Sequence, residues 1–185
     1  MAGKTETEGF RALLTGGPPD LGPGPRPGAM SHEELDKVMG LLLGDTDLTA
    51  ISQKLVRGLV LLWHDHQEAA HTIAQDIENA DGSYLHGMVH RREPDYGNAK
   101  YWFRRVGRHA AFPIIAERAV RSLESLKEQS LRKELMPGGE WDAFEFIDLC
   151  ERSSGRVADK GLVGTLRQIQ AIEFEVLLEC FRDRE

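Results

Sequence analysis

The sequence has few cysteines and no long apolar segment. Its two cysteines, Cys150 and Cys180, lie far apart and form no CxxC pair, which favours reduced core thiols. A disulfide bond between them is the alternative. The longest apolar run, residues 59–63, is much shorter than the roughly 18 residues of a membrane span. The N-terminus also lacks the apolar core of a secretory signal, so we expect a cytoplasmic protein.

Positive charge is also scarce. The chain has 23 Lys and Arg against 30 Asp and Glu, and its formal net charge is −7. Binding to nucleic acid or to an anionic membrane needs a cationic surplus, so this balance argues against both partners. The chain contains no GxSxG motif, Walker loop, GxGxxG, HExxH or zinc ribbon. These absences remove the commonest signatures of hydrolases, nucleotide-binding proteins and metalloproteases.

The fold class follows from the periodicity of the apolar residues. No segment shows the alternation of a half-buried strand, and most of the chain repeats with a helical period. We expect an all-α protein, a single-domain bundle of about six to seven helices in residues 31–185. Residues 1–30 hold five of the eight prolines, and this Pro/Gly-rich composition predicts a flexible, disordered tail.

Capping residues set the expected boundaries of the helices. Ser31 followed by Glu34 is a capping box at the first helix, and Gly44 ends it. Asp47 begins a long second helix, and the sequence Asn-Ala-Asp-Gly at 79–82 forms the turn after it. Ser83, Asn98 and Pro113 begin later helices. The expected helices therefore cover residues 31–44, 47–78, 83–93, 98–107, 113–135, 141–152 and 162–181.

The most informative absence is local, because no Lys or Arg occurs between Arg57 and Arg91. The wet face of a helix normally carries Lys, Arg and Glu. Here the polar positions are filled by His, Gln, Glu and Asp instead. This segment also holds five of the seven histidines. Such side chains are suited to binding a cation or to exchanging protons near neutral pH.

Helical spacing groups these residues into two stripes. On a wheel of the expected helix 47–78, spacings of 4 and 3 place three polar residues opposite the apolar face, and the next helix repeats the spacing. If the two helices are antiparallel neighbours, the stripes face each other. The candidate metal ligands are then His64, Glu68, His71, His86, His90 and Glu93. This donor set suits Zn²⁺, or an iron or manganese centre inside a bundle.

Two other interpretations of the stripes remain open. The same residues can act as acid–base groups in a ligand pocket that holds no metal. They can also be the solvated side of two helices, with no site at all.

An arginine-rich segment follows the histidines. Guanidinium groups hold carboxylates and phosphates with paired hydrogen bonds, and a helix N-terminus favours an anion. We therefore expect a site for an anionic small molecule at Arg91, Arg92, Asp95, Asn98, Lys100, Tyr101, Arg104 and Arg105. Alternatively, the first two arginines pair with Glu93 and Asp95 to hold a loop, while the neighbouring aromatics fill the core.

The segment WHDHQEAAHTIAQDIENADGSYLHGMVHRREPDYGNAKYWFRRVGRH resembles a family of uncharacterised proteins from bacteria and fungi. These proteins share a WHD…AH…Q…GS..H…HRREPD..NAKYWFRR core. The resemblance covers about a quarter of the chain. It supports the boundaries of the expected site and implies no activity.

Two functions are compatible with these observations. The first is an enzyme or small-molecule-binding protein with a His/Glu-lined polar pocket, with or without a metal, and arginines that anchor an anionic ligand. The second is a non-enzymatic helical interaction module, a monomer or homodimer, with a structural polar core and no metal. The last expected helix favours this alternative, because its apolar residues have the spacing of a bundle interface.

Overall fold

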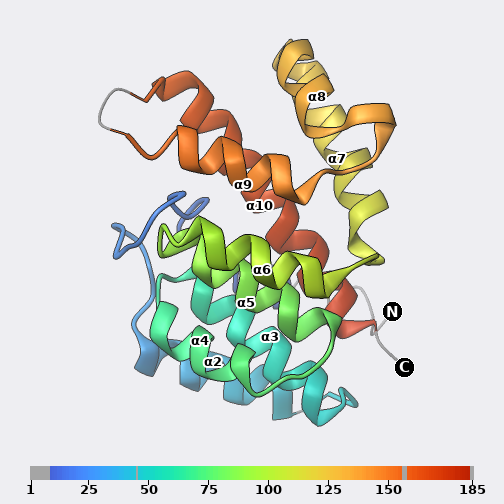
Figure 1. Cartoon of the computed structure of the whole chain (residues 1–185). Helices are drawn as coiled ribbons and strands as arrows, with labels where there is room; N and C mark the ends of the chain where they lie inside the picture. Colours follow the sequence, from blue (N-terminus) through green and yellow to red (C-terminus); the bar gives the residue numbers. More distant parts are fainter. Residues whose placement is uncertain (1–8, 45, 156–157, 184–185) are drawn as a thin grey trace.

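The structure is a computed structural model that describes residues 9–44, 46–155 and 158–183. Within these ranges the regular structure is helical and no strand is present, which confirms the all-α prediction. The number of helices differs from the prediction of six to seven, since the described residues form ten helical elements (Figure 1). None of the helices in these ranges is both long enough and apolar enough to cross a membrane.

The chain forms nine α-helices and one short 3-10 helix, η1, in its described part. Their bounds are α2 (His32–Gly44), α3 (Ala50–Trp63), α4 (Gln67–Gln75), α5 (Ala80–Arg92), α6 (Tyr96–Val106), α7 (Ala111–Ser125), α8 (Gln129–Leu135), η1 (Pro137–Gly139), α9 (Ala143–Arg152) and α10 (Lys160–Arg182).

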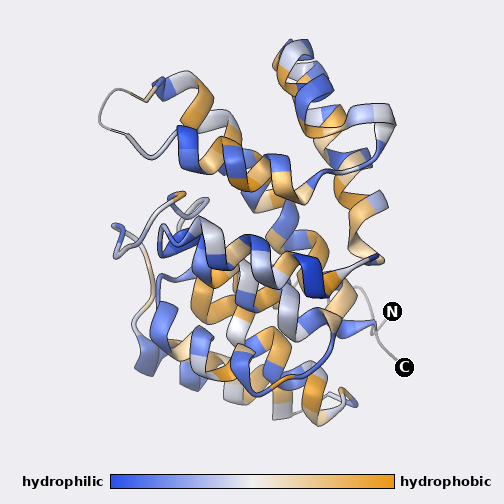
Figure 2. Ribbon diagram, viewed as in Figure 1, coloured by the Kyte–Doolittle hydropathy of each residue, from blue (hydrophilic) through white to orange (hydrophobic). Residues whose placement is uncertain are grey.

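The helices gather into two groups, which are joined by α10 and by the packing of α6 on α9. Figure 1 shows α2 to α6 at one end of the molecule and α7 to α9 at the other. Helix α10 packs against α3 in the first group and against α7 in the second. The buried residues of the helices are mostly apolar, and Figure 2 shows hydrophobic stretches, in orange, along the ribbons in the interior of the molecule. Helix α5 packs on α4 and α6, and every residue from Asp81 to Arg92 is buried.

The extra helices arise because two long predicted helices are each interrupted. The predicted helix 47–78 stops at Trp63 and resumes at Gln67, and the predicted helix 113–135 stops at Ser125 and resumes at Gln129. In both breaks one residue adopts a positive φ, 68° at Asp65 and 62° at Lys127. Neither residue is a glycine, which is why the sequence gives no sign of these breaks.

Both interruptions have the hydrogen bonds of a Schellman motif. In the first, the N–H of His66 donates to the carbonyl of Leu61 at 2.9 Å. In the second, the N–H of Glu128 donates to the carbonyl of Leu123 at 2.8 Å. These six-to-one bonds satisfy carbonyl groups that the end of a helix leaves without partners. The first break determines which of the predicted site residues can meet.

The capping box at the first helix is confirmed. The N–H of Ser31 donates to the carboxylate of Glu34 at 2.8 Å, and the N–H of Glu34 donates to Ser31 Oγ at 3.3 Å. Several other boundaries differ. The side chain of Thr49, and not Asp47, caps α3, and Asp95, and not Asn98, caps α6.

Residues 79–82 begin α5 where a turn was predicted. Asn79 caps the helix by accepting from the N–H of Gly82 at 2.8 Å. A Cβ at Gly82 would lie 2.0 Å from the carbonyl oxygen of Ile77. Gly82 is therefore required for close packing inside the helix, and not for a turn.

Residues 9–30, which the composition predicts as a flexible tail, lie against the helices. Phe10 and Leu13 are buried in the core. Side chains from α3, α5 and α10 donate hydrogen bonds to carbonyl groups of this segment at Thr15, Pro19, Asp20 and Gly22. Prolines lack an N–H but keep the carbonyl, so such a segment can be held by arginine and glutamine donors. The remaining part of the predicted tail, residues 1–8, lies outside the described residues.

Candidate metal centre

Helix α5 brings both predicted groups of polar residues into the interior. His86 and His90 are one turn apart and are only 4 % and 6 % exposed. Arg91 and Arg92, at the end of the same helix, are fully buried. A buried polar side chain is costly unless it finds a partner. The partners of these four side chains therefore indicate what each group does.

The histidines of α5 meet a third histidine from α4. The Nε2 atoms of His71 and His86 are 2.7 Å apart, and the ring of His71 also lies against that of His90, with centroids 4.9 Å apart. The rings of His86 and His90 are stacked at 4.8 Å. One ring nitrogen from each histidine lies within 4.8 Å of the other two. We call these three residues the histidine cluster.

Side chains around the histidine cluster orient its rings. The indole of Trp102 on α6 stacks on His86 with centroids 3.9 Å apart. The carboxylate of Glu93 is 3.1 Å from Nδ1 of His90, and Nδ2 of Asn98 is 3.1 Å from its Nε2. A carboxylate on one nitrogen of a histidine leaves the opposite nitrogen for a metal. Nδ1 of His86 is buried and has no hydrogen-bond partner among the described residues.

Burial favours the neutral form of two histidines of the cluster, His86 and His90. Burial, with smaller contributions from the neighbouring His71 and His90, lowers the pKa of His86 from 6.5 to about 4. Burial also lowers the pKa of His90, although the carboxylate of Glu93 acts in the opposite direction. An imidazole binds a metal only in its neutral form. His86 and His90 are therefore in their metal-binding protonation state at neutral pH.

The structure does not bring His64 to this cluster. The break at Asp65 turns α4 away from the direction of α3, so the two helices do not share one stripe. His64 is instead buried, where its Nδ1 accepts from the N–H of Met30 at 3.0 Å and its Nε2 donates to the carbonyl of Leu13 at 2.7 Å. Burial lowers its pKa. His64 thus holds the N-terminal segment in place.

The two predicted carboxylate ligands are also separate from the three rings. Glu68 is exposed on α4 and does not belong to the group of three ring nitrogens. It lines a polar cavity of about 430 Å³ together with His66 and Glu93. Glu93 reaches the cluster only through its hydrogen bond to His90. The structure therefore places three of the six predicted ligands together, and Glu93 beside them.

Arg91 belongs to a buried ion pair. Its guanidinium makes two hydrogen bonds to the carboxylate of Glu173 on α10, and the same carboxylate accepts from the hydroxyl of Tyr84 at 3.0 Å. The side chains of Arg91 and Glu173 are both 0 % exposed. Burial raises the pKa of Tyr84 and raises that of the neighbouring Cys150 thiol to about 12. We call Arg91, Glu173 and Tyr84 the arginine cluster.

Arg92 holds the break between α3 and α4. It bonds the carboxylate of Asp65 at 2.6 Å, and Arg26 bonds the same oxygen at 2.9 Å. Burial works against ionisation of Asp65, but these hydrogen bonds hold its pKa below the usual value. Arg92 also donates to carbonyl groups of the N-terminal segment. The positive φ at Asp65 is therefore stabilised by two buried arginines.

The remaining residues of the predicted anion site occupy different surroundings. Asp95 caps α6, and Lys100 pairs with Asp148 on α9. Tyr101, Arg104 and Arg105 are exposed on α6, where the guanidinium of Arg105 lies 5.3 Å from the centre of the Trp102 ring. The structure does not gather the eight predicted residues around one point. The two most buried arginines of the set, Arg91 and Arg92, bind carboxylates of the protein itself.

A further buried pair escaped the sequence analysis. Nε2 of His109 lies 2.8 Å from a carboxylate oxygen of Asp81, and Nδ1 of His109 accepts from the N–H of Ala111 at 3.1 Å. The two residues lie on different elements, and no local pattern links them. Glu173 was missed for the same reason, since it lies 82 positions from Arg91.

Comparison of the chain with protein-family models, with curated proteins and with solved structures gives no match.

Proposed function

We propose that this protein binds a divalent transition-metal ion through His71, His86 and His90. The observation that carries the proposal is the approach of three imidazoles, each with a ring nitrogen within 4.8 Å of the others. Three imidazole ligands suit Zn²⁺ best among the ions of helical bundles, because iron and manganese centres of that kind also use several carboxylates. Glu68 lies apart from the three rings, so we favour zinc.

The composition of the surrounding helices supports this proposal. No Lys or Arg occurs at positions 58–90, so no cationic side chain of α4 competes with the ion. The carboxylate of Glu93 would accept from Nδ1 of His90 and direct its Nε2 to the metal. Nε2 of His90 now contacts Asn98, so metal binding would displace that amide.

Metal binding requires an adjustment of the rings, because their ring nitrogens are spread over up to 4.8 Å. Tetrahedral zinc with Zn–N distances of about 2.0–2.1 Å sets its ligand nitrogens about 3.3 Å apart. The Nε2 atoms of His71 and His86 are 2.7 Å apart, so they would separate by roughly 0.6 Å. His71 is only half-buried, whereas His86 is held by Trp102. We therefore expect His71 to move.

Three protein ligands leave one coordination position for water or a substrate atom. A zinc ion in such a site lowers the pKa of bound water and polarises a carbonyl or phosphoryl oxygen. The centre is therefore of the kind that catalyses reactions, in contrast to a structural site closed by four side chains. Glu93, one hydrogen bond from His90, is the nearest carboxylate for proton transfer.

The test is titration of tag-free, chelator-treated protein with ZnCl₂ by calorimetry. We expect one ion per chain, and at least a tenfold weaker affinity in each of His71→Gln, His86→Gln and His90→Gln. His32→Gln, at an exposed histidine outside the cluster, is the matched control and should bind like the parent. Circular dichroism establishes that each variant is folded.

Two outcomes would contradict the proposal. In the first, the parent protein takes up no zinc; in the second, the three variants bind zinc as well as the parent does. The first outcome, no zinc uptake, would favour the interpretation in which the histidines act as acid–base groups without a metal.

A further inference from the structure

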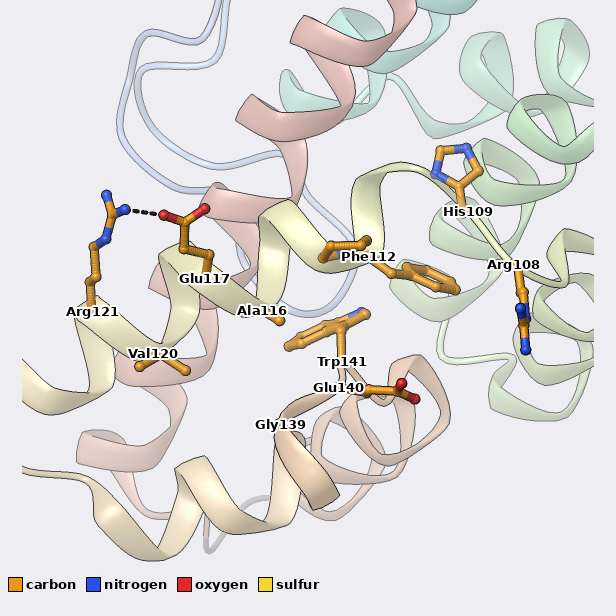
Figure 3. A pocket seen from close by; sticks show the side chains of 11 residues that line it. Arg108, His109, Phe112, Ala116, Glu117, Val120, Arg121, Gly139, Glu140 and Trp141 are labelled. Carbon is orange, nitrogen blue, oxygen red and sulfur yellow. Dashed lines mark hydrogen bonds and ion pairs between the residues drawn. The ribbon is translucent and has the colours of Figure 1, made fainter.

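A second cavity lies between α7 and the chain that joins η1 to α9 (Figure 3). Its volume is about 740 Å³, which is within the range of small-molecule sites. It shares no lining residue with the histidine cluster. Gly138 and Gly139, with φ of 68° and 89°, turn the chain so that the residues after them face α7.

The middle of this cavity is apolar. Phe112, Ala116 and Val120 lie along one side of α7, and the indole of Trp141 lies opposite them (Figure 3). His109 also lines the cavity, but both of its ring nitrogens are already hydrogen-bonded within the protein. These walls favour a ligand with an aromatic or large aliphatic group.

The charged residues of the cavity form two sets. Glu117 and Arg121 pair with each other at one end. Arg108 and Glu140 lie toward the opposite end in Figure 3. Within the part of the chain that the structure describes, neither of these two side chains makes a hydrogen bond or an ion pair. One end of the cavity therefore has one positively charged side chain, Arg108, and one negatively charged side chain, Glu140, that are available to a ligand.

Trp141 adds an unsatisfied donor to the same cavity. Its Nε1 is buried, and no acceptor for it is present among the described residues. A buried donor without an acceptor costs free energy that a ligand oxygen can recover. Figure 3 shows the indole beside the ring of Phe112, which is only half-buried.

We propose that this cavity binds an α-amino acid with an aromatic or large aliphatic side chain. Arg108 receives the carboxylate, and Glu140 receives the ammonium group. The side chain of the ligand lies between Phe112 and Trp141. A molecule with both charges matches this end of the cavity better than an anion or a cation, because either of those leaves one protein charge without a partner.

The experiment is calorimetric titration of the full-length protein with four probes. These are L-phenylalanine, which has both charged groups and the aromatic side chain, and three probes that each lack one of them. The probe 3-phenylpropanoate lacks the ammonium group, 2-phenylethylamine lacks the carboxylate, and glycine lacks the side chain. We expect one L-phenylalanine per chain and at least about tenfold weaker binding of the other three, given the strength of charged hydrogen bonds. Equal binding of the three aromatic probes, or no binding of L-phenylalanine at millimolar concentration, overturns the proposal.

Two variants assign the two charged groups of the ligand. Arg108→Gln should weaken L-phenylalanine about tenfold and leave 2-phenylethylamine unchanged, because that probe has no carboxylate. Glu140→Gln should weaken L-phenylalanine binding similarly and leave the binding of 3-phenylpropanoate unchanged, because that probe has no ammonium group. Arg104→Gln and Glu128→Gln, at exposed positions outside the cavity, are the matched controls. If Arg108→Gln and Glu140→Gln bind L-phenylalanine like these controls, the assignment is wrong.

Discussion

Helix α5 carries two groups of buried polar side chains that are satisfied in different ways. In the arginine cluster, Arg91 meets the carboxylate of Glu173, so charge is balanced inside the protein. In the histidine cluster, the rings of His86 and His90 meet each other and His71, and burial keeps them neutral. The two groups lie on one helix, within a few residues of each other.

The difference shows how a structural polar group is distinguished from a ligand site. Every charge of the arginine cluster has its opposite within the fold, so no charge is left for a ligand to balance, although Nε of Arg91 has no hydrogen-bond partner among the described residues. The histidine cluster has ring nitrogens that only contact one another or an amide, and one nitrogen of His86 has no partner among the described residues. Polar groups of this second kind gain most from an added cation.

The largest effect is expected from breaking the arginine cluster. Glu173→Ala should lower the free energy of unfolding by about 3–5 kcal/mol, because it leaves the buried charge of Arg91 without a partner. Urea denaturation measures the change. The double variant Arg91→Met, Glu173→Leu should recover most of the loss, since it removes both charges and keeps the volume. A loss below 1 kcal/mol for Glu173→Ala would show that the pair is not closed to water.

Zinc should raise the free energy of unfolding by binding to the histidine cluster, and the arginine cluster should not contribute to this effect. Zinc at 100 times its dissociation constant should raise the free energy of unfolding by about 2.7 kcal/mol, since it binds only the folded chain. Thermal denaturation with and without ZnCl₂ measures this stabilisation. It should disappear in His71→Gln and persist in His32→Gln. The same stabilisation in both variants would place the ion elsewhere.

Acid should lower the free energy of unfolding of the metal-free protein through the protonation of His86. The folded-state pKa of His86 is about 4, below the unfolded value of 6.5, so unfolding takes up protons between these two values. Stability is then fully present above about pH 6.5 and falls as pH decreases toward 4. The loss between pH 7 and pH 5 should be about 2 kcal/mol from this group. His86→Phe should reduce the loss by that amount, as measured by urea denaturation at both pH values. An unchanged profile would mean that His86 is accessible to water.

The smallest effect is expected at Asn98. Its amide lies 3.1 Å from Nε2 of His90, the nitrogen that we assign to the metal. Asn98→Ala removes this competing contact and should tighten zinc binding by a few-fold, in line with the net value of one hydrogen bond. Zinc calorimetry measures it. Weaker binding in the variant would indicate that Asn98 takes part in holding the ion.

The helical breaks explain which parts of the candidate site were predictable. The apolar period and the capping box at Ser31 predict helices correctly, because both act within one or two turns of the chain. The pairing of His71 with His86 and His90 also follows from spacing, since α4 and α5 are neighbours joined by a short connection. The exclusion of His64 does not follow, because the break depends on Asp65 and its contacts with Arg26 and Arg92.

The sequence by itself determined the helical class of the fold, the polar character of residues 58–90 and the position of three of the candidate ligands. These properties come from local spacing and from residue type. Only the tertiary structure decided that Arg91 and Arg92 are internal, because their partners lie far away in the chain. It also decided that the proline-rich residues 9–30 pack on the helices, since the donors that hold their carbonyl groups come from α3, α5 and α10. Partners that are distant in sequence leave no local pattern, and charge balance inside a fold is settled only when the chain is packed.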